Sequence, residues 1–104
     1  MSHTAEGTIR AQGPNRFVAN FIMPNGQLRS FVASIDPPTD NITTSTATLT
    51  WSDDNQLNGQ DRYSGTLGAD VTITLVRGPT MKGTLQEPVD PTQAIVGNGY
   101  WIIS

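Results

Sequence analysis

The sequence predicts an all-β fold, either an antiparallel β-sandwich or a small β-barrel of about eight short strands. Threonine, a good strand former, occurs 14 times and leucine only 6 times. Seven prolines and ten glycines divide the chain into short pieces. The longest stretch free of both, residues 39–58, is rich in threonine and serine, which have poor helix propensity. Short strands separated by turn signals are typical of both architectures.

The expected strands follow one another between clusters of Gly, Pro, Asn and Asp. They are residues 6–12, 16–23, 27–36, 42–52, 62–67, 70–77, 81–86 and 94–103. The tripeptide Gly-Thr-Ile/Leu recurs at Gly7, Gly65 and Gly83, and its unequal spacing excludes a solenoid or propeller repeat. We expect each of these glycines to allow a close strand approach or a bulge. With 104 residues, the chain has the size of a single all-β domain over 1–104.

Residues 16–36 form the best-defined unit, a β-hairpin. Pro24 suits the first corner of a type I turn and Gly26 the left-handed residue after it, which predicts a three-residue loop with Met23 opposite Gln27. The strand period of two then places one set of apolar residues on a single face, which we assign to the core: Phe17, Ala19, Phe21, Phe31, Ala33 and Ile35.

The other face of this hairpin is also apolar, because it carries Val18, Ile22, Leu28 and Val32. A single small sandwich covers only one face of a hairpin. We therefore expect the second face to be buried, either by a strand that crosses over it or by another subunit, and a homo-oligomer is the predicted assembly.

The segment TTSTATLTW, residues 43–51, has one apolar and one hydroxyl face. Ala47, Leu49 and Trp51 are assigned to the core, and Thr44, Thr46, Thr48 and Thr50 to the opposite side. A similar alternation in VTITLV, residues 71–76, makes an array at most two strands wide. Three interpretations stay open: a solvent face chosen for strand propensity, a surface that orders water or ice, and a polar face that docks sugars or a partner strand.

Charge and composition argue against several classes of function. The formal net charge is −3, and the five arginines are spread too evenly to form a basic face for nucleic acid. No apolar segment approaches the ~20 residues needed to span a membrane. The first ten residues have no basic start followed by an apolar run, so we expect no secretory signal. The default compartment is the cytoplasm, although export by another route stays open. Because cysteine is absent, disulfides and zinc–thiolate sites are excluded.

Catalysis is the less favoured prediction. His3 is the only histidine and sits at a terminus that usually frays, which argues against a catalytic triad or a histidine metal site. A carboxylate pair from the loop DDNQLNGQD, residues 53–61, is the one catalytic route left open. The same loop lacks the glutamate that an EF-hand needs, so calcium binding through Asp53, Asp54, Asn55 and Asp61 stays open without being predicted, and no cofactor is expected.

The predicted function is a non-catalytic, lectin-like binding module. An aromatic ring can cover the apolar face of a sugar while Asp and Asn groups hold its hydroxyls. Tyr100 and Trp101 must point to opposite faces of their strand, and the sequence does not decide which one lies in the core. The candidate ligand-binding residues come from the loop 53–61, from Tyr63 beside it and from the segment GNGYW: Asp53, Asp54, Asn55, Asn58, Asp61, Tyr63, Asn98, Tyr100 and Trp101. The alternative is a structural or assembly protein that oligomerises through the 16–36 hairpin.

Overall fold

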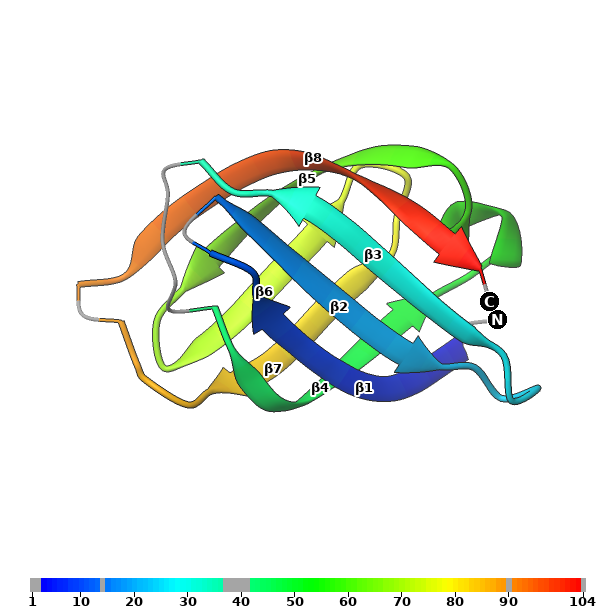
Figure 1. The fold of residues 1–104 in the computed structure, drawn as a ribbon, viewed down its shortest axis with the longest axis horizontal. Coiled ribbons are helices and arrows are strands. Elements are labelled where there is room, and N and C mark those ends of the chain that lie inside the picture. The colour runs from blue at the N-terminus through cyan, green and yellow to red at the C-terminus, as the bar shows by residue number, and fades with distance from the viewer. Residues whose placement is uncertain (1–2, 14, 37–41, 90, 104) are drawn as a thin grey trace.

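The computed structural model describes residues 3–13, 15–36, 42–89 and 91–103, and they form a closed eight-stranded antiparallel β-barrel (Figure 1). All eight predicted strands are present. Their bounds are β1 His3–Ala11, β2 Arg16–Ile22, β3 Leu28–Ser34, β4 Thr44–Trp51, β5 Gln60–Leu67, β6 Asp70–Leu75, β7 Thr80–Leu85 and β8 Gln93–Ile103. Of the two predicted architectures, the barrel is therefore confirmed.

The barrel is built from two Greek keys. Around the wall the strands run β1-β2-β3-β8-β5-β6-β7-β4. Each half of the chain is a three-stranded meander whose fourth strand returns beside the first, giving the orders β4-β1-β2-β3 and β8-β5-β6-β7. The β3–β8 and β7–β4 pairings join the halves, so that each described strand is paired on both sides.

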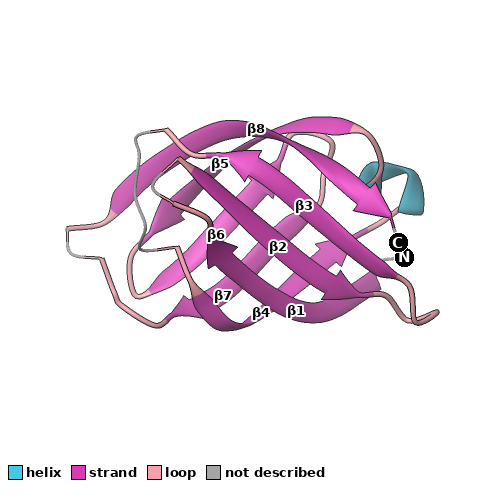
Figure 2. Ribbon diagram, in the orientation of Figure 1, coloured by secondary structure: helices cyan, strands magenta, loops and turns pink. Residues whose placement is uncertain are grey.

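A short 3-10 helix, η1 (Asp54–Leu57), connects β4 to β5. Figure 2 shows it at the end of the barrel where β1 begins and β8 ends. The sequence predicted a loop between two strands for this segment. Among the residues described, no helix has the length and apolar character that a membrane crossing would need.

The barrel interior is filled with apolar side chains. The residues assigned to the core on the hairpin and on β4 are all buried, with Phe17, Ala19, Phe21, Phe31 and Leu49 completely inaccessible. The Phe31 ring lies between those of Phe17 and Trp101, with centroid separations of 6.2 and 5.0 Å. The predicted alternation of apolar and polar residues is thus the alternation between the inside and the outside of the barrel.

The 16–36 hairpin has the predicted register. Met23 N donates to Gln27 O at 2.8 Å, and Gly26 N donates to Met23 O at 2.8 Å. Gly26 has a φ of +86°, the left-handed conformation that the three-residue loop requires.

The first strand, β1, begins three residues earlier than predicted. His3 pairs with Trp51 of β4, and the centroids of their two rings lie 5.6 Å apart.

The repeated Gly-Thr-Ile/Leu glycines mark close approaches between strands, as predicted. At Gly7, Gly65 and Gly83, an added Cβ would lie less than 3.0 Å from a backbone oxygen of the neighbouring strand. Glycine, which has no Cβ, therefore allows the two backbones to approach this closely.

The second face of the hairpin lies on the outside of the barrel. Among the described residues, all eight strands belong to the wall and none crosses over this face, so the first of the two predicted covers is not found there. Ile22 is 57% exposed, and Val18, Leu28 and Val32 are half-buried. Burial by another subunit stays a prediction.

The threonine face of β4 is confirmed except at Thr44. Thr46 and Thr48 are exposed, whereas Thr44 is buried and its Oγ1 accepts a hydrogen bond of 3.1 Å from Ile9 N. The β4–β7 register shifts between Thr44 and Ala47, and this irregularity breaks the strict alternation that the prediction assumed.

The hydroxyl array is wider than the two strands expected from the sequence. One row of directly paired residues crosses five strands, from β5 through β6, β7 and β4 to β1: Ser64, Thr74, Thr80, Thr50 and Thr4. The row beside it contains Thr72 and Thr48 but is interrupted by Lys82 and Glu6. Because sheet pairing joins residues distant in sequence, the width of the array could not be read from two isolated strands.

Candidate functional site

A groove of about 610 Å³ lies on the outer wall of the barrel across β5 and β8. We call it the β5–β8 groove. Its lining consists of Gln60, Asp61, Arg62, Val76, Arg77, Asn98, Gly99 and Tyr100. Three of the residues predicted from the sequence, Asp61, Asn98 and Tyr100, therefore meet in one place.

Strand pairing positions the polar side chains of the groove. Gln60 lies opposite Tyr100, and Arg62 lies opposite Asn98. All four residues are exposed on the outer face, and the Tyr100 side chain is 46% exposed. Between Asn98 and Tyr100, Gly99 contributes no side chain to this surface. The groove thus combines a half-exposed aromatic ring with amide and guanidinium groups held on two regular strands.

Asp61 lies beneath the groove, with its side chain only 7% exposed. Its Oδ1 accepts a hydrogen bond of 2.8 Å from Arg62 N, and its Oδ2 accepts one of 3.3 Å from Arg77 N. Because β5 carries Arg62 and the turn after β6 carries Arg77, this carboxylate holds the turn against the strand. A buried carboxylate needs such donors to offset its desolvation.

Arg77 joins the groove to the loop 53–58. Its Nη2 donates to Asn55 O at 2.8 Å, its Nη1 donates to Asn58 O, and its own carbonyl accepts a hydrogen bond of 2.9 Å from Gln56 Nε2. The backbone of the predicted loop is therefore fixed to the turn that borders the groove.

The loop 53–58 is also ordered from within. Asp53 caps η1, because its Oδ1 accepts a hydrogen bond of 3.0 Å from Asn55 N. Gln56 Oε1 accepts from Ser52 N at 3.0 Å and from Asp53 N at 3.2 Å, which completes a capping box. Asn55 and Asn58 are exposed, and the side chain of Asp54 lies outside the described part of the structure.

The structure does not bring Tyr63 or Trp101 into the groove, because both rings point into the barrel. Tyr63 is 3% exposed, packs edge-on against Phe17, and donates a hydrogen bond of 2.7 Å from its hydroxyl to Ser34 O. Burial, and to a smaller extent the charge of Asp36, raises the pKa of the Tyr63 phenol above its ordinary value. The hydroxyl therefore keeps its proton and the hydrogen bond to Ser34.

Trp101 is 7% exposed and packs on Phe31. The sequence did not decide which of Tyr100 and Trp101 lies in the core. In the structure, Trp101 and Ile95 face the core, and Tyr100, Val96 and Ile102 face outwards. Within the described residues, the indole Nε1 of Trp101 is buried without a hydrogen-bond partner.

The loop does not assemble a group of metal-binding acidic side chains in the part of the chain that is described. No three His, Cys, Asp or Glu side chains gather there, and both oxygens of Asp61 accept backbone hydrogen bonds. The open calcium alternative therefore gains no support from the described residues.

Sequence reasoning missed Gln60, Arg62, Val76 and Arg77 as lining residues. Arg77 is 16 residues from Asp61, and only the pairing of β5 with β6 brings them together. Gln60 and Arg62 are two residues apart on β5, so both side chains face outwards. This alternation was the one feature of the sequence that could have identified them as lining residues.

Comparisons of the chain with protein-family models, with curated proteins and with solved structures give no match.

Proposed function

We propose that this protein is a non-catalytic binding module, and that the β5–β8 groove binds a polar ligand such as a glycan. The observation that carries the proposal is the placement of the half-exposed Tyr100 ring among Gln60, Arg62 and Asn98. A ring of this kind covers the apolar face of a pyranose, while amide and guanidinium groups hydrogen-bond its hydroxyls.

The rigidity of the groove supports binding rather than chemistry. Its polar side chains stand on paired strands, and the adjoining turn is held by Asp61 and Arg77. Preorganised groups lose little conformational entropy when a ligand binds. Among the described residues, the lining contains a single carboxylate, Asp61, and not the pair that glycoside hydrolysis requires.

Replacing Tyr100 with alanine should weaken glycan binding by at least about tenfold, because the stacking platform is lost. The measurement is a glycan array followed by titration of the bound glycan against the wild type and the variant. Tyr100→Phe is the control, since it keeps the ring and should keep most of the affinity. Full binding by Tyr100→Ala with an unchanged melting temperature would place the ligand elsewhere.

A second candidate function is assembly through the outer face of β2, β3 and β8, which we call the β2–β3–β8 face. Its cross-strand rows join apolar residues, since Val18 lies opposite Val32 and Val32 opposite Tyr100, while Ile22 lies opposite Leu28. Ile22 is 57% and Ile102 43% exposed. The outer face of β5, β6, β7, β4 and β1 carries hydroxyl side chains instead. The polar pair Asn20 and Ser30 separates the two apolar rows. Exposed apolar side chains grouped on one face in this way are found at many interaction sites.

If this face mediates assembly, light scattering should give a defined oligomer whose mass falls to that of one chain in an Ile22→Asp variant. A charge buried at an apolar interface without a partner opposes association strongly. Thr48→Asp is the matched control, because it adds the same charge on the hydroxyl face and should leave the oligomer intact. A strict monomer at every protein concentration would exclude self-assembly through this face.

A further inference from the structure

The β5–β8 groove concentrates positive charge in a protein that is negative overall. The chain has a formal net charge of −3. Two of its arginines, Arg62 and Arg77, line the groove against one carboxylate, Asp61, which is buried and bonded to backbone amides. A ligand entering the groove therefore meets exposed cationic groups, whereas the carboxylate of the lining is buried.

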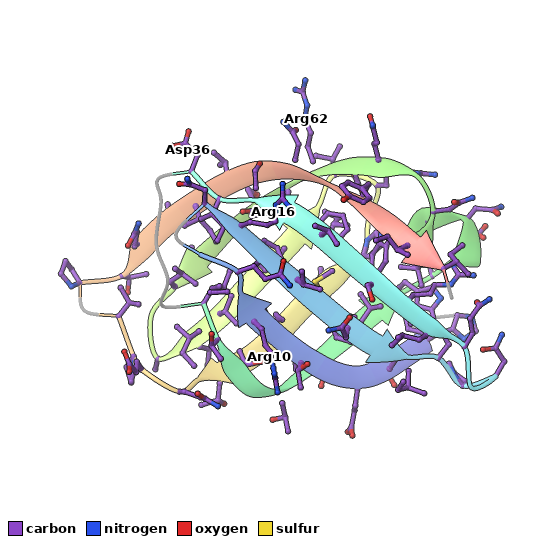
Figure 3. The ribbon with its side chains drawn as sticks, viewed as in Figure 1. Arg10, Arg16, Asp36 and Arg62 are labelled. Atoms are coloured by element: carbon purple, nitrogen blue, oxygen red, sulfur yellow. The ribbon has the colours of Figure 1, made fainter. Side chains whose placement is uncertain are left out.

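The side chains of Arg62 and Arg77 differ in what they contact. Arg77 donates through both terminal nitrogens to the carbonyls of Asn55 and Asn58, so its guanidinium is used to hold the loop. Arg62 is exposed, and its side chain projects outwards from the barrel wall (Figure 3). A projecting guanidinium is well suited to bind a planar carboxylate or a sulfate through two parallel hydrogen bonds.

The strand register places Arg62 beside the aromatic ring of the groove. Arg62 lies directly opposite Asn98 on β8, and Tyr100 is the next outward-facing residue along that strand. Diagonal neighbours of this kind lie about 7–8 Å apart at their backbones, within the reach of long side chains. A sugar ring stacked on Tyr100 would thus hold an acidic substituent within the reach of Arg62.

From this arrangement we propose that the ligand of the groove is an acidic saccharide, with its ring against Tyr100 and its carboxylate or sulfate paired with Arg62. The inference rests on the proposed binding function and narrows its ligand class. Arg77 acts as a positioning residue, because it fixes the loop that borders the groove and its terminal nitrogens are already engaged.

The test is an NMR titration of the amide resonances with matched glycosides. Methyl glucoside, methyl glucuronide and methyl glucoside 6-sulfate share one ring and differ in charge and in the acidic group, and sodium acetate supplies an anion without a sugar. We expect the acidic glycosides to bind at least about tenfold more tightly than the neutral one, as for a charge-assisted hydrogen bond. Comparison of the glucuronide with the 6-sulfate identifies the preferred acid.

Arg62→Gln should remove this preference, and Arg16→Gln is the matched control. Arg16 is an exposed arginine of β2 that lies opposite Ser34, and it is not among the residues that line the groove. Both substitutions change the net charge equally. Arg16→Gln should therefore keep the preference for the acidic glycosides.

Four results would overturn the inference. Equal affinity for neutral and acidic glycosides would leave saccharide binding standing and refute the acidic class. Equal loss of preference in Arg62→Gln and Arg16→Gln would show an effect of overall charge, and acetate binding as tightly as the glucuronide would show a site for anions rather than for sugars. If no glycoside shifts the groove resonances, the proposed function fails as well.

Discussion

Replacing Gly7 with alanine should lower the free energy of unfolding by about 3 kcal/mol or more, the upper end of what overpacking costs. The added Cβ would overlap the carbonyl oxygen of Asn20 on β2, and the nearest atoms are all backbone. Since β1 is also paired with β4, the strand has no direction in which to retreat without breaking a ladder.

Urea denaturation of the wild type and the variant measures this loss. Gly26→Ala is the matched control, because nothing lies within 4 Å of its added Cβ and only the left-handed φ of +86° is unfavourable. That conformation costs a non-glycine residue about 1–2 kcal/mol. If Gly7→Ala proved no more destabilising than Gly26→Ala, the close approach of β1 to β2 would be contradicted.

Replacing Phe31 with alanine should lower the free energy of unfolding by about 3–5 kcal/mol, as for other buried phenylalanines. Phe31 is completely buried, and its ring packs against those of Phe17 and Trp101. Its removal would leave a cavity that rigid paired strands cannot close. The barrel would lose a large share of its stability, since domains of this size are stable by only about 5–15 kcal/mol.

Thermal melting and urea denaturation both report this effect. Phe31→Leu, which keeps most of the volume, should be markedly less damaging. Val32→Ala is a second control, because Val32 is the next residue of β3 but faces outwards and is half-buried. A loss of less than about 1 kcal/mol for Phe31→Ala would contradict the filled interior of the barrel.

The strands and their inward faces could be predicted from the sequence because they depend on local features. Alternation along residues 16–36 and 43–51 placed Phe17, Phe31 and Trp51 in the core, and all three are buried. Pro24 and Gly26 fixed the hairpin register for the same reason, since turn geometry is set by the residues of the turn itself.

Features that depend on pairing between distant segments could not be predicted. The closure of the barrel requires β3 to pair with β8 and β7 to pair with β4, and no local pattern specifies these partners. The burial of Thr44 is a second example, because its hydroxyl accepts a hydrogen bond from Ile9, which is 35 residues away in the sequence.

The candidate site could likewise be predicted only in part. Asp61, Asn98 and Tyr100 were selected from the sequence by residue type and meet in the groove. Tyr63 was selected by the same criterion but faces inwards, since it has the opposite parity to Arg62 on β5. Residue type identified suitable chemistry, whereas strand parity decided which rings are available to a ligand.

The most direct test of the binding account is an NMR map of the barrel in the presence of the tightest glycan found on an array. The account predicts shifts centred on the amides of Gln60, Arg62, Asn98 and Tyr100, with those of Thr48 and Thr80 on the hydroxyl face unmoved. Shifts confined to the hydroxyl face, or absent from the whole protein, would contradict it.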